Sequence, residues 1–217
     1  ILRIDVVQEG EQIELNTARI DSPLISFSAE GRTDTSFQNA DLSIDLSADS
    51  VRQIAQSYGQ DASGELAMIG RIQRVEGVLD GRLSGRISDF TSPPADLDRL
   101  DLVVELGQTG DDISISLDST AAGLRLDKLE AGLIGPAQIE AQATLGTEIL
   151  TLNSLTLRST PLDIDVSGSQ VRETGEAQFQ ARVQTGQAEP FAQAYGIDAA
   201  GQLDLRAEGT LTAGVLS

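Results

Sequence analysis

Residues 41–46 read DLSIDL, with an apolar side chain at every second position. The same alternation recurs in residues 113–117 (ISISL) and 139–143 (IEAQA). A period of two is typical of a β-strand with one dry and one hydrated face, because successive side chains point to opposite sides of the backbone. The sequence therefore predicts a mainly β protein made of antiparallel strands.

Short Gly- and Asp-containing segments separate the alternating stretches and predict turns, since these residues tolerate positive φ or form Asx-type bonds. The predicted turns are Glu9-Gly10-Glu11, Asp80-Gly81, Thr109-Gly110-Asp111, Gly146-Thr147 and Thr174-Gly175-Glu176. Ser92-Pro93-Pro94-Ala95 interrupts the alternation, because proline cannot donate to a strand ladder. We expect residues 91–95 to form a kink in one continuous sheet over 1–217; the alternative is a subdomain boundary.

Two stretches have the spacing of an amphipathic helix instead. Residues 51–58 have apolar side chains at i, i+3, i+4 and i+7, with Asp49 or Ser50 as N-cap and Gly59 as the stop. Residues 188–195 have the same spacing, with Pro190 in the first turn and Gly196 as the stop. The sequence predicts a short helix in each, packed on the sheet.

The two predicted helices lie in two similar segments. Residues 55–66 read AQSYGQDASGEL, and residues 192–203 read AQAYGIDAAGQL. The apolar positions of residues 25–66 align without a gap on those of residues 162–203. This similarity predicts an internal repeat made of strands, a helix and further strands.

Composition and charge exclude several classes of function. The 217 residues contain 15 basic and 34 acidic side chains, a net charge of −19, which argues against binding to a phosphate backbone. The chain has no Cys, hence no disulfide or thiolate metal site, and no His, hence no Ser-His dyad. No stretch is long and apolar enough for a signal peptide or a membrane span. We expect a non-enzymatic protein without a cofactor.

Three groups of carboxylates are candidate sites. Asp163 and Asp165 alternate on one strand, about 6.6 Å apart at ~3.3 Å per residue, a separation that suits paired glycosidase acids. The groups Asp96-Asp98-Asp101 and Asp111-Asp112 offer oxygen ligands for calcium, but neither matches a calcium-loop pattern. We interpret all three groups as solvated surface charge and predict no catalytic or metal site.

An antiparallel sheet with one apolar face must hide that face under a second sheet, under helices, or by curling. Two helices of about ten residues cannot cover so many strands. Aromatic side chains make up 3% of the chain, with no Trp, so the apolar face is aliphatic. This composition favours a curled trough over a closed sandwich, which usually recruits aromatics.

The helix-exit segments carry a resemblance to a known family. Gly64-Glu65-Leu66 and Gly201-Gln202-Leu203 follow the predicted helices, and Gly70 or Glu208-Gly209-Thr210-Leu211 comes next. This arrangement resembles the repeats of TamB and the wider AsmA-like proteins of Gram-negative envelopes. The resemblance implies a β-taco, an elongated curled antiparallel sheet with an apolar groove. It also implies a location in the periplasm, with an inner-membrane anchor outside residues 1–217.

The implied function is movement of phospholipid between the inner and outer membranes, assistance to outer-membrane protein assembly, or both. The implied partners are phospholipid acyl chains and an outer-membrane protein of the TamA or Omp85 type. We expect an apolar column to line the groove: Leu42, Ile44, Leu46, Leu66, Met68, Leu83, Ile87, Leu126, Ile139, Leu155, Leu157, Ile164, Phe179 and Leu203. The alternative function is a structural or adhesin-like β-sandwich stalk that is dry inside and carries no lipid.

Overall fold

The protein is mainly β, and its described strands form one open antiparallel sheet. The computed structural model describes residues 1–57, 61–93, 95–126, 135–194, 198, 200–212 and 215–216. Thirteen strands have eight residues or more, and two have two residues each. Sequential strands are neighbours throughout the sheet, except that β9 pairs with β7 and β8 pairs with β10.

The first half of the sheet contains the longest strands. Its elements are β1 (Leu2–Glu9), β2 (Gln12–Asp21), β3 (Ser26–Asp34), β4 (Ala40–Ala48), α1 (Arg52–Ser57), β5 (Ser63–Val75), β6 (Val78–Ser92) and β7 (Ala95–Thr109). The second half begins with β8 (Asp112–Ala122) and the short β9 (Arg125–Leu126). It continues with β10 (Ala137–Leu145), β11 (Ile149–Arg158), β12 (Asp163–Val171), β13 (Ala177–Thr185), α2 (Ala188–Ala194), β14 (Leu203–Thr212) and β15 (Val215–Leu216).

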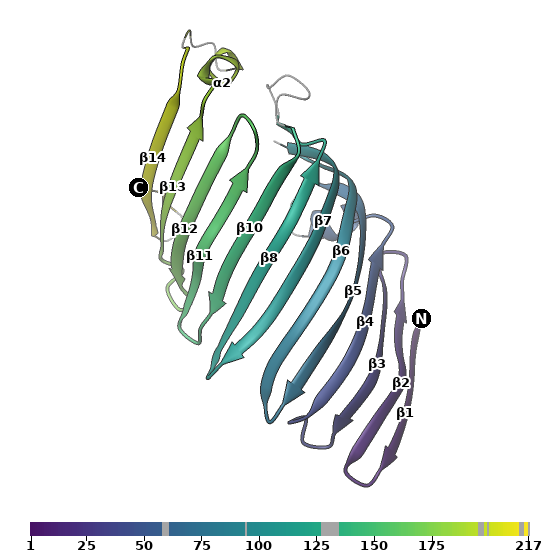
Figure 1. The fold of residues 1–217 in the computed structure, drawn as a ribbon. Coiled ribbons are helices and arrows are strands. Elements are labelled where there is room, and N and C mark those ends of the chain that lie inside the picture. Colours follow the sequence, from purple (N-terminus) through teal and green to yellow (C-terminus); the bar gives the residue numbers. More distant parts are fainter. Residues whose placement is uncertain are drawn as a thin grey trace.

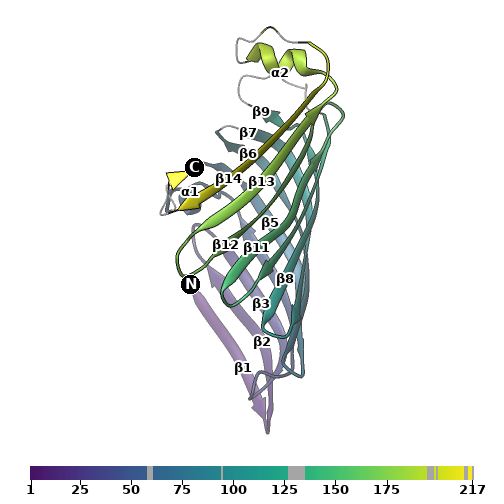
Figure 2. The ribbon, with the colours of Figure 1, turned by 90° about the vertical axis from the view of Figure 1, so that its left-hand side faces the viewer.

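The sheet is a long twisted ribbon of strands, from β1 at one end to β14 at the other (Figure 1). Seen along its length, both ends bend toward the same side, so that the sheet has a concave and a convex face (Figure 2). At a strand spacing of about 4.8 Å, the thirteen long strands extend for roughly 58 Å. No described strand belongs to a second sheet that would cover the concave face.

Four of the five predicted turns join adjacent strands. Glu9-Gly10-Glu11 lies between β1 and β2, Thr109-Gly110-Asp111 between β7 and β8, and Thr174-Gly175-Glu176 between β12 and β13. The glycines of these three turns have φ of 62°, 63° and 71°, the left-handed region in which glycine is favoured. Gly146-Thr147 lies between β10 and β11.

The turn predicted at Asp80-Gly81 is wrong. These residues lie inside β6. The chain reverses before β6 begins, at Glu76-Gly77, between the register partners Val75 and Val78. Glu76 and Gly77 have φ of 50° and 83°, the two positive values of a two-residue type I′ hairpin. Gly81 instead faces Ile72 and Leu106 on the neighbouring strands, where it leaves room for their side chains.

Pro93 lies at the end of a hairpin, and Pro94 is outside the described residues. Ser92 and Ala95 are register partners at the junction of β6 and β7, and both strands pair along nearly their whole length. The irregularity of this hairpin lies just before the prolines, where Asp89 has a φ of 50°. The sheet runs through this region from β5 to β8 without interruption.

Helices α1 and α2 both connect a strand to the next strand of the sheet, β4 to β5 and β13 to β14. The backbone N–H of Arg52 contacts the Ser50 hydroxyl at 3.4 Å. The first intrahelical hydrogen bond runs from the Ala55 N–H to the Val51 carbonyl oxygen at 2.9 Å, so Val51 is at the N-cap of α1 and the predicted cap Ser50 is one residue before it. The predicted helix stops, Gly59 and Gly196, lie outside the described residues, as do Tyr58 and Tyr195 at the ends of the predicted apolar stripes.

Gly31 in β3 has no room for a side chain. Its φ is +147°, and a Cβ built on it would lie 2.0 Å from the carbonyl oxygen of Asp41 on β4. We predict that Gly31→Ala lowers the free energy of unfolding by about 1–3 kcal/mol, because the backbone must leave this conformation or separate the two strands. Gly186→Ala is the control, since nothing lies within 4 Å of its Cβ position. Equal midpoints for the two variants in urea unfolding would contradict the prediction.

Candidate functional site

Most apolar side chains of the long strands lie on one face, because antiparallel register partners share a face of the sheet. The central row of this face runs from β2 to β14 through consecutive register partners. Its members are Ile20, Phe27, Leu46, Met68, Gly85, Leu102, Ser119, Ile139, Leu157, Ile164, Val183 and Leu205. Further rows of apolar register partners run beside this row on both sides. We call the whole surface the apolar face.

The register brings together thirteen of the fourteen residues predicted to line the groove. Leu42, Ile44, Leu46, Leu66, Met68, Leu83, Ile87, Ile139, Leu155, Leu157, Ile164, Phe179 and Leu203 all lie on the apolar face. The fourteenth, Leu126, lies in β9 opposite Ala95, and its side chain is outside the described part of the structure.

The prediction missed the middle of the apolar face. β7 contributes Leu100, Leu102, Val104 and Leu106, and β8 contributes Ile115 and Leu117. Leu102 belongs to the central row, and the other five are register partners of one another or of predicted groove residues. The signal was present in the sequence, since residues 113–117 alternate as clearly as residues 41–46. The apolar face is therefore continuous between the two segments that the prediction had emphasised.

The apolar face is largely uncovered. No large side chain of the described residues is fully buried, and the buried hydrophobic residues are mainly Ala. The chain exposes 13888 Å², whereas a compact protein of 22.9 kDa exposes about 9,600 Å². This excess means that the sheet leaves the aliphatic side chains half-exposed instead of closing them into a core.

One local core exists beside helix α2. Ala121, Leu124, Ala137 and Leu162 are buried together, and Phe191 of α2 packs against them. Leu97, Leu100, Ile139, Leu157, Ile164 and Val183 also pack against this cluster. Helix α2 therefore covers the apolar face only at the rim where β8, β10 and β12 end or begin.

The apolar face carries almost no charge. Among the described long strands, Arg74 is the one charged residue that the regular register places there, and it lies beside the β5–β6 hairpin. Its Nε donates to the carbonyl oxygen of Gly77 at 2.9 Å. The polar Ser119 is 2% exposed, and its hydroxyl donates to the Ile139 carbonyl oxygen at 2.9 Å. The polar group in the central row is thus satisfied.

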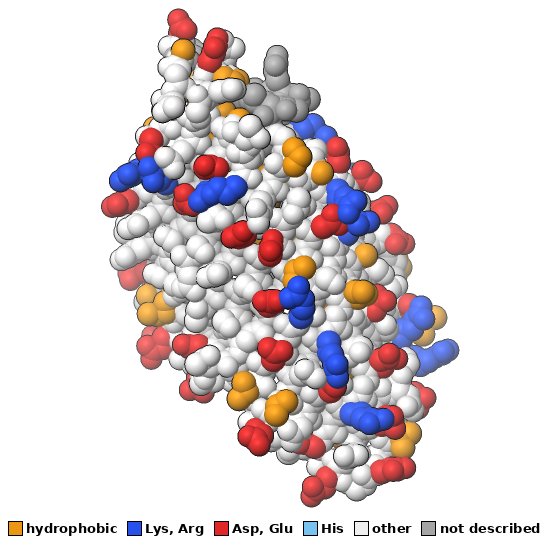
Figure 3. Space-filling view, viewed as in Figure 1, with side chains coloured by type: hydrophobic (Ala, Val, Ile, Leu, Met, Phe, Trp, Pro, Cys, Tyr) orange, Lys and Arg blue, Asp and Glu red, His pale blue; other side chains and the backbone are white. Residues whose placement is uncertain are grey.

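The opposite face, which we call the polar face, carries the charges. Figure 3 shows it covered by acidic, basic and uncharged polar side chains, with hydrophobic side chains in small separate groups. Cross-strand ion pairs include Arg86 with Asp101, Arg82 with Glu105 and Arg182 with Asp204. Figure 3 views the sheet from the side that is convex in Figure 2. The polar face is therefore the convex one, and the apolar face is the concave one.

The seven carboxylates considered as catalytic or calcium sites lie on or near the polar face, and three of them contact arginine. Asp165 pairs with Arg158, and Asp98 pairs with Arg125 at 2.6 Å. Asp101 accepts hydrogen bonds from Arg99 and Arg86, which lower the pKa of its carboxyl. Among the described residues no three His, Cys, Asp or Glu side chains are grouped to hold a metal ion.

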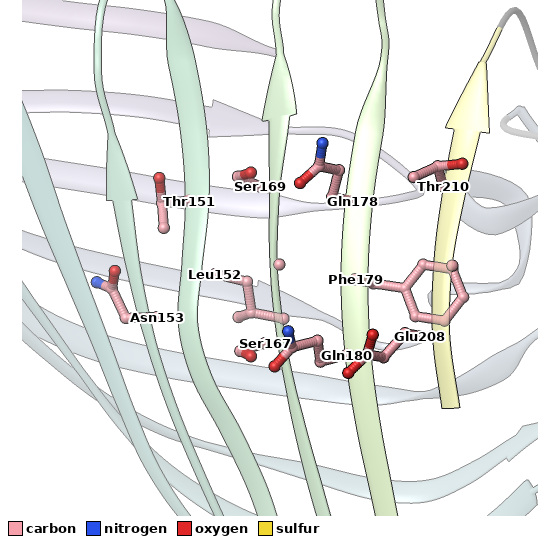
Figure 4. Close-up of a pocket in the computed structure, with 12 residues that line it drawn as sticks. Thr151, Leu152, Asn153, Ser167, Ser169, Gln178, Phe179, Gln180, Glu208 and Thr210 are labelled. Carbon is pink, nitrogen blue, oxygen red and sulfur yellow. The ribbon is translucent and has the colours of Figure 1, made fainter. Parts of the chain in front are cut away.

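A hollow of about 720 Å³ lies between β11, β12, β13 and β14 (Figure 4). Thr151, Ser169, Gln178 and Thr210 line it as one row of register partners, and Ser167, Gln180 and Glu208 form a second. On the other side of the sheet, at the strand positions between these rows, the ring of Phe179 lies against Gly209, where a Cβ would be 2.6 Å from it. The hollow is shallow and holds one carboxylate and no basic side chain.

No protein-family profile, no curated protein and no solved structure matches this chain. Within the described residues, none of the helices has the length and apolar character needed to cross a bilayer.

The lowered pKa of Asp101 yields a prediction on acid stability. Its two arginine partners stabilise the charged form in the folded state, so this contribution is present above the ordinary pKa of 3.8 and is lost as the pH falls through the lower native value. We expect Asp101→Asn to be less stable than the wild type at pH 6 and to approach it below pH 3.8. Urea unfolding across this pH range measures the difference, with Asp80→Asn as control. A difference independent of pH would contradict the prediction.

Proposed function

We propose that this chain is a segment of a non-enzymatic lipid conduit in the periplasm. In this proposal the apolar face carries phospholipid acyl chains between the inner and outer membranes, assists the assembly of outer-membrane proteins, or does both. The observation that carries the proposal is the unbroken, nearly uncharged apolar face, which spans all thirteen long strands and has no covering layer among the described residues.

Acyl chains suit this surface in energy and in shape. Burying a CH₂ group contributes about 0.8 kcal/mol, so a single chain gains affinity from aliphatic contact alone. The rows of register partners continue from strand to strand, so similar contacts repeat along the sheet. A ligand held by such non-directional contacts can slide, because no fixed polar group holds it in place.

The curled β-taco is part of this proposal, as is its construction from a repeated unit. β3 and β12 are offset by 137 positions, and so are β4 and β13. Val51 N–H donates to the Gly64 carbonyl oxygen at 2.9 Å, and Ala188 N–H donates to that of Gly201 at 2.7 Å, with the same offset. These matched elements support two copies of one unit, residues 25–66 and 162–203, each containing a short amphipathic helix.

The proposed surroundings follow from the resemblance to TamB and AsmA-like proteins. They are an inner-membrane anchor outside residues 1–217 and an outer-membrane partner of the TamA or Omp85 type. The alternative function is a structural or adhesin-like stalk. A sandwich stalk needs a second sheet to dry its interior, and every described strand here belongs to a single sheet.

The test is to place a charge on the apolar face. We predict that Leu117→Asp and Leu155→Asp each lower the amount of co-purified phospholipid about tenfold, because an ionised carboxylate cannot be desolvated under an acyl chain. The controls are Ser114→Asp and Ser154→Asp, which add the same charge to the same strands on the polar face.

Native mass spectrometry and lipid extraction measure the bound lipid after expression in a Gram-negative host, and circular dichroism checks that each variant is folded. Lipid that survives both apolar-face changes in folded protein would refute the conduit. A wild-type protein that carries no lipid would favour the structural stalk.

A further inference from the structure

Two large aliphatic side chains lie on the polar face of the sheet, in the middle of their strands. Ile69 of β5 and Val103 of β7 both face the polar side, and Ile69 is 60% exposed. The other large apolar residues that the register places on this face of the described long strands lie at strand ends or in the edge strand β1, such as Val75, Val78 and Val171. Ile69 and Val103 lie in mid-strand, and each has an aspartate as one of its register partners.

Ile69 and Val103 form the sides of a hollow. They lie in one row of register partners with Ser84 of β6 between them, and the small Ser84 leaves a depression two strand spacings wide. The hollow has a volume of about 670 Å³, and Ala67, Ile69, Ser84 and Val103 contribute to its lining. Its centre is therefore apolar and of a size that accepts aliphatic side chains, while the ion-paired Arg86 and Asp101 and the polar Thr120 also line it.

Carboxylates stand at both ends of the same row. Asp45 of β4 is the register partner of Ile69, and Asp118 of β8 is the register partner of Val103. Neither carboxylate forms an ion pair within the described residues, whereas Asp101, which also lines the hollow, is paired with Arg86 and Arg99. The row thus has a free negative charge, an apolar centre and a second free negative charge.

We propose that this hollow is a docking site for a basic amphipathic helix of a partner protein. The centre of the row is about 9.6 Å from each aspartate at a strand spacing of ~4.8 Å. Residues at i−7, i and i+7 of a helix lie on one face and are about 10.5 Å apart. A helix lying across β4 to β8, with Leu or Ile at its centre and Lys or Arg seven residues away on each side, matches both the shape and the charges.

The net charge of the chain favours a basic helix as the ligand of this hollow. With a net charge of −19, the protein repels anionic membranes and nucleic acid, and the free aspartates at both ends of the hollow add to that repulsion locally. A cationic partner is attracted by the same field, and its aliphatic side chain covers Ile69 and Val103. The site lies on the face opposite the proposed lipid track, so a helix bound there leaves the track accessible.

The experiment uses a labelled 18-residue alanine-based peptide with Leu at its centre and Lys at the positions seven residues before and after. Fluorescence anisotropy measures its binding to the full chain. We expect Ile69→Ser with Val103→Ser, and separately Asp45→Asn with Asp118→Asn, to weaken binding about tenfold. Peptides with the Leu replaced by Ser or the Lys by Glu should lose a similar factor.

Two controls decide where and how the peptide binds. Glu30→Gln with Asp80→Asn removes the same charge from other positions on the polar face, and an equal loss of affinity there would overturn the proposal in favour of non-specific attraction. Leu117→Asp alters only the apolar face, and a loss of affinity in that variant would overturn it in favour of binding in the groove. Unchanged binding in both controls supports the docking site, whether or not the chain carries lipid.

Discussion

The whole structure depends on one constraint, the combination of period-two alternation with antiparallel register. Register partners face the same way, so once Leu46 pairs with Met68 and Leu66 with Ile87, the apolar face of each strand is tied to that of its neighbour. A slip of one residue at any strand would move its apolar side chains to the polar face. The register shifts that do occur, as between Leu152 and Leu155, add residues and restore the same face on each side.

Glycines on neighbouring strands make room for the large side chains of the apolar face. Large side chains of the apolar face lie over glycines on the neighbouring strand: a Cβ on Gly70 would be 2.6 Å from Leu83, and one on Gly85 would be 2.6 Å from Met68. The large residue therefore lies along the sheet instead of projecting from it. Small and large residues alternate across strands, and the apolar face is low and open where a globular protein would have an interlocked core.

The sequence predicted the class of fold and most of the apolar face, because alternation is a local signal that each strand carries independently. It predicted a turn at Asp80-Gly81 wrongly, since the chain offers a Gly at both 77 and 81 and composition does not tell a turn glycine from one that makes room for Ile72. The register decides between them, and register is a property of two strands. Ile69 and Val103 were missed for the same reason: they are 34 positions apart in the chain, and only the pairing through Ser84 makes them neighbours.

An uncovered aliphatic face is a hazard for any chain, because two such faces bury each other readily. The charges of the polar face reduce this tendency to self-associate. Its arginines are largely paired with carboxylates, as in Arg182 with Asp204, so the excess of acidic groups is left as a net negative field around the sheet. Two copies approaching face to face bring these fields together, whereas a neutral apolar chain meets no such barrier. The acidic composition and the open apolar face are therefore parts of one arrangement, which disfavours self-association while leaving the face accessible to an uncharged ligand.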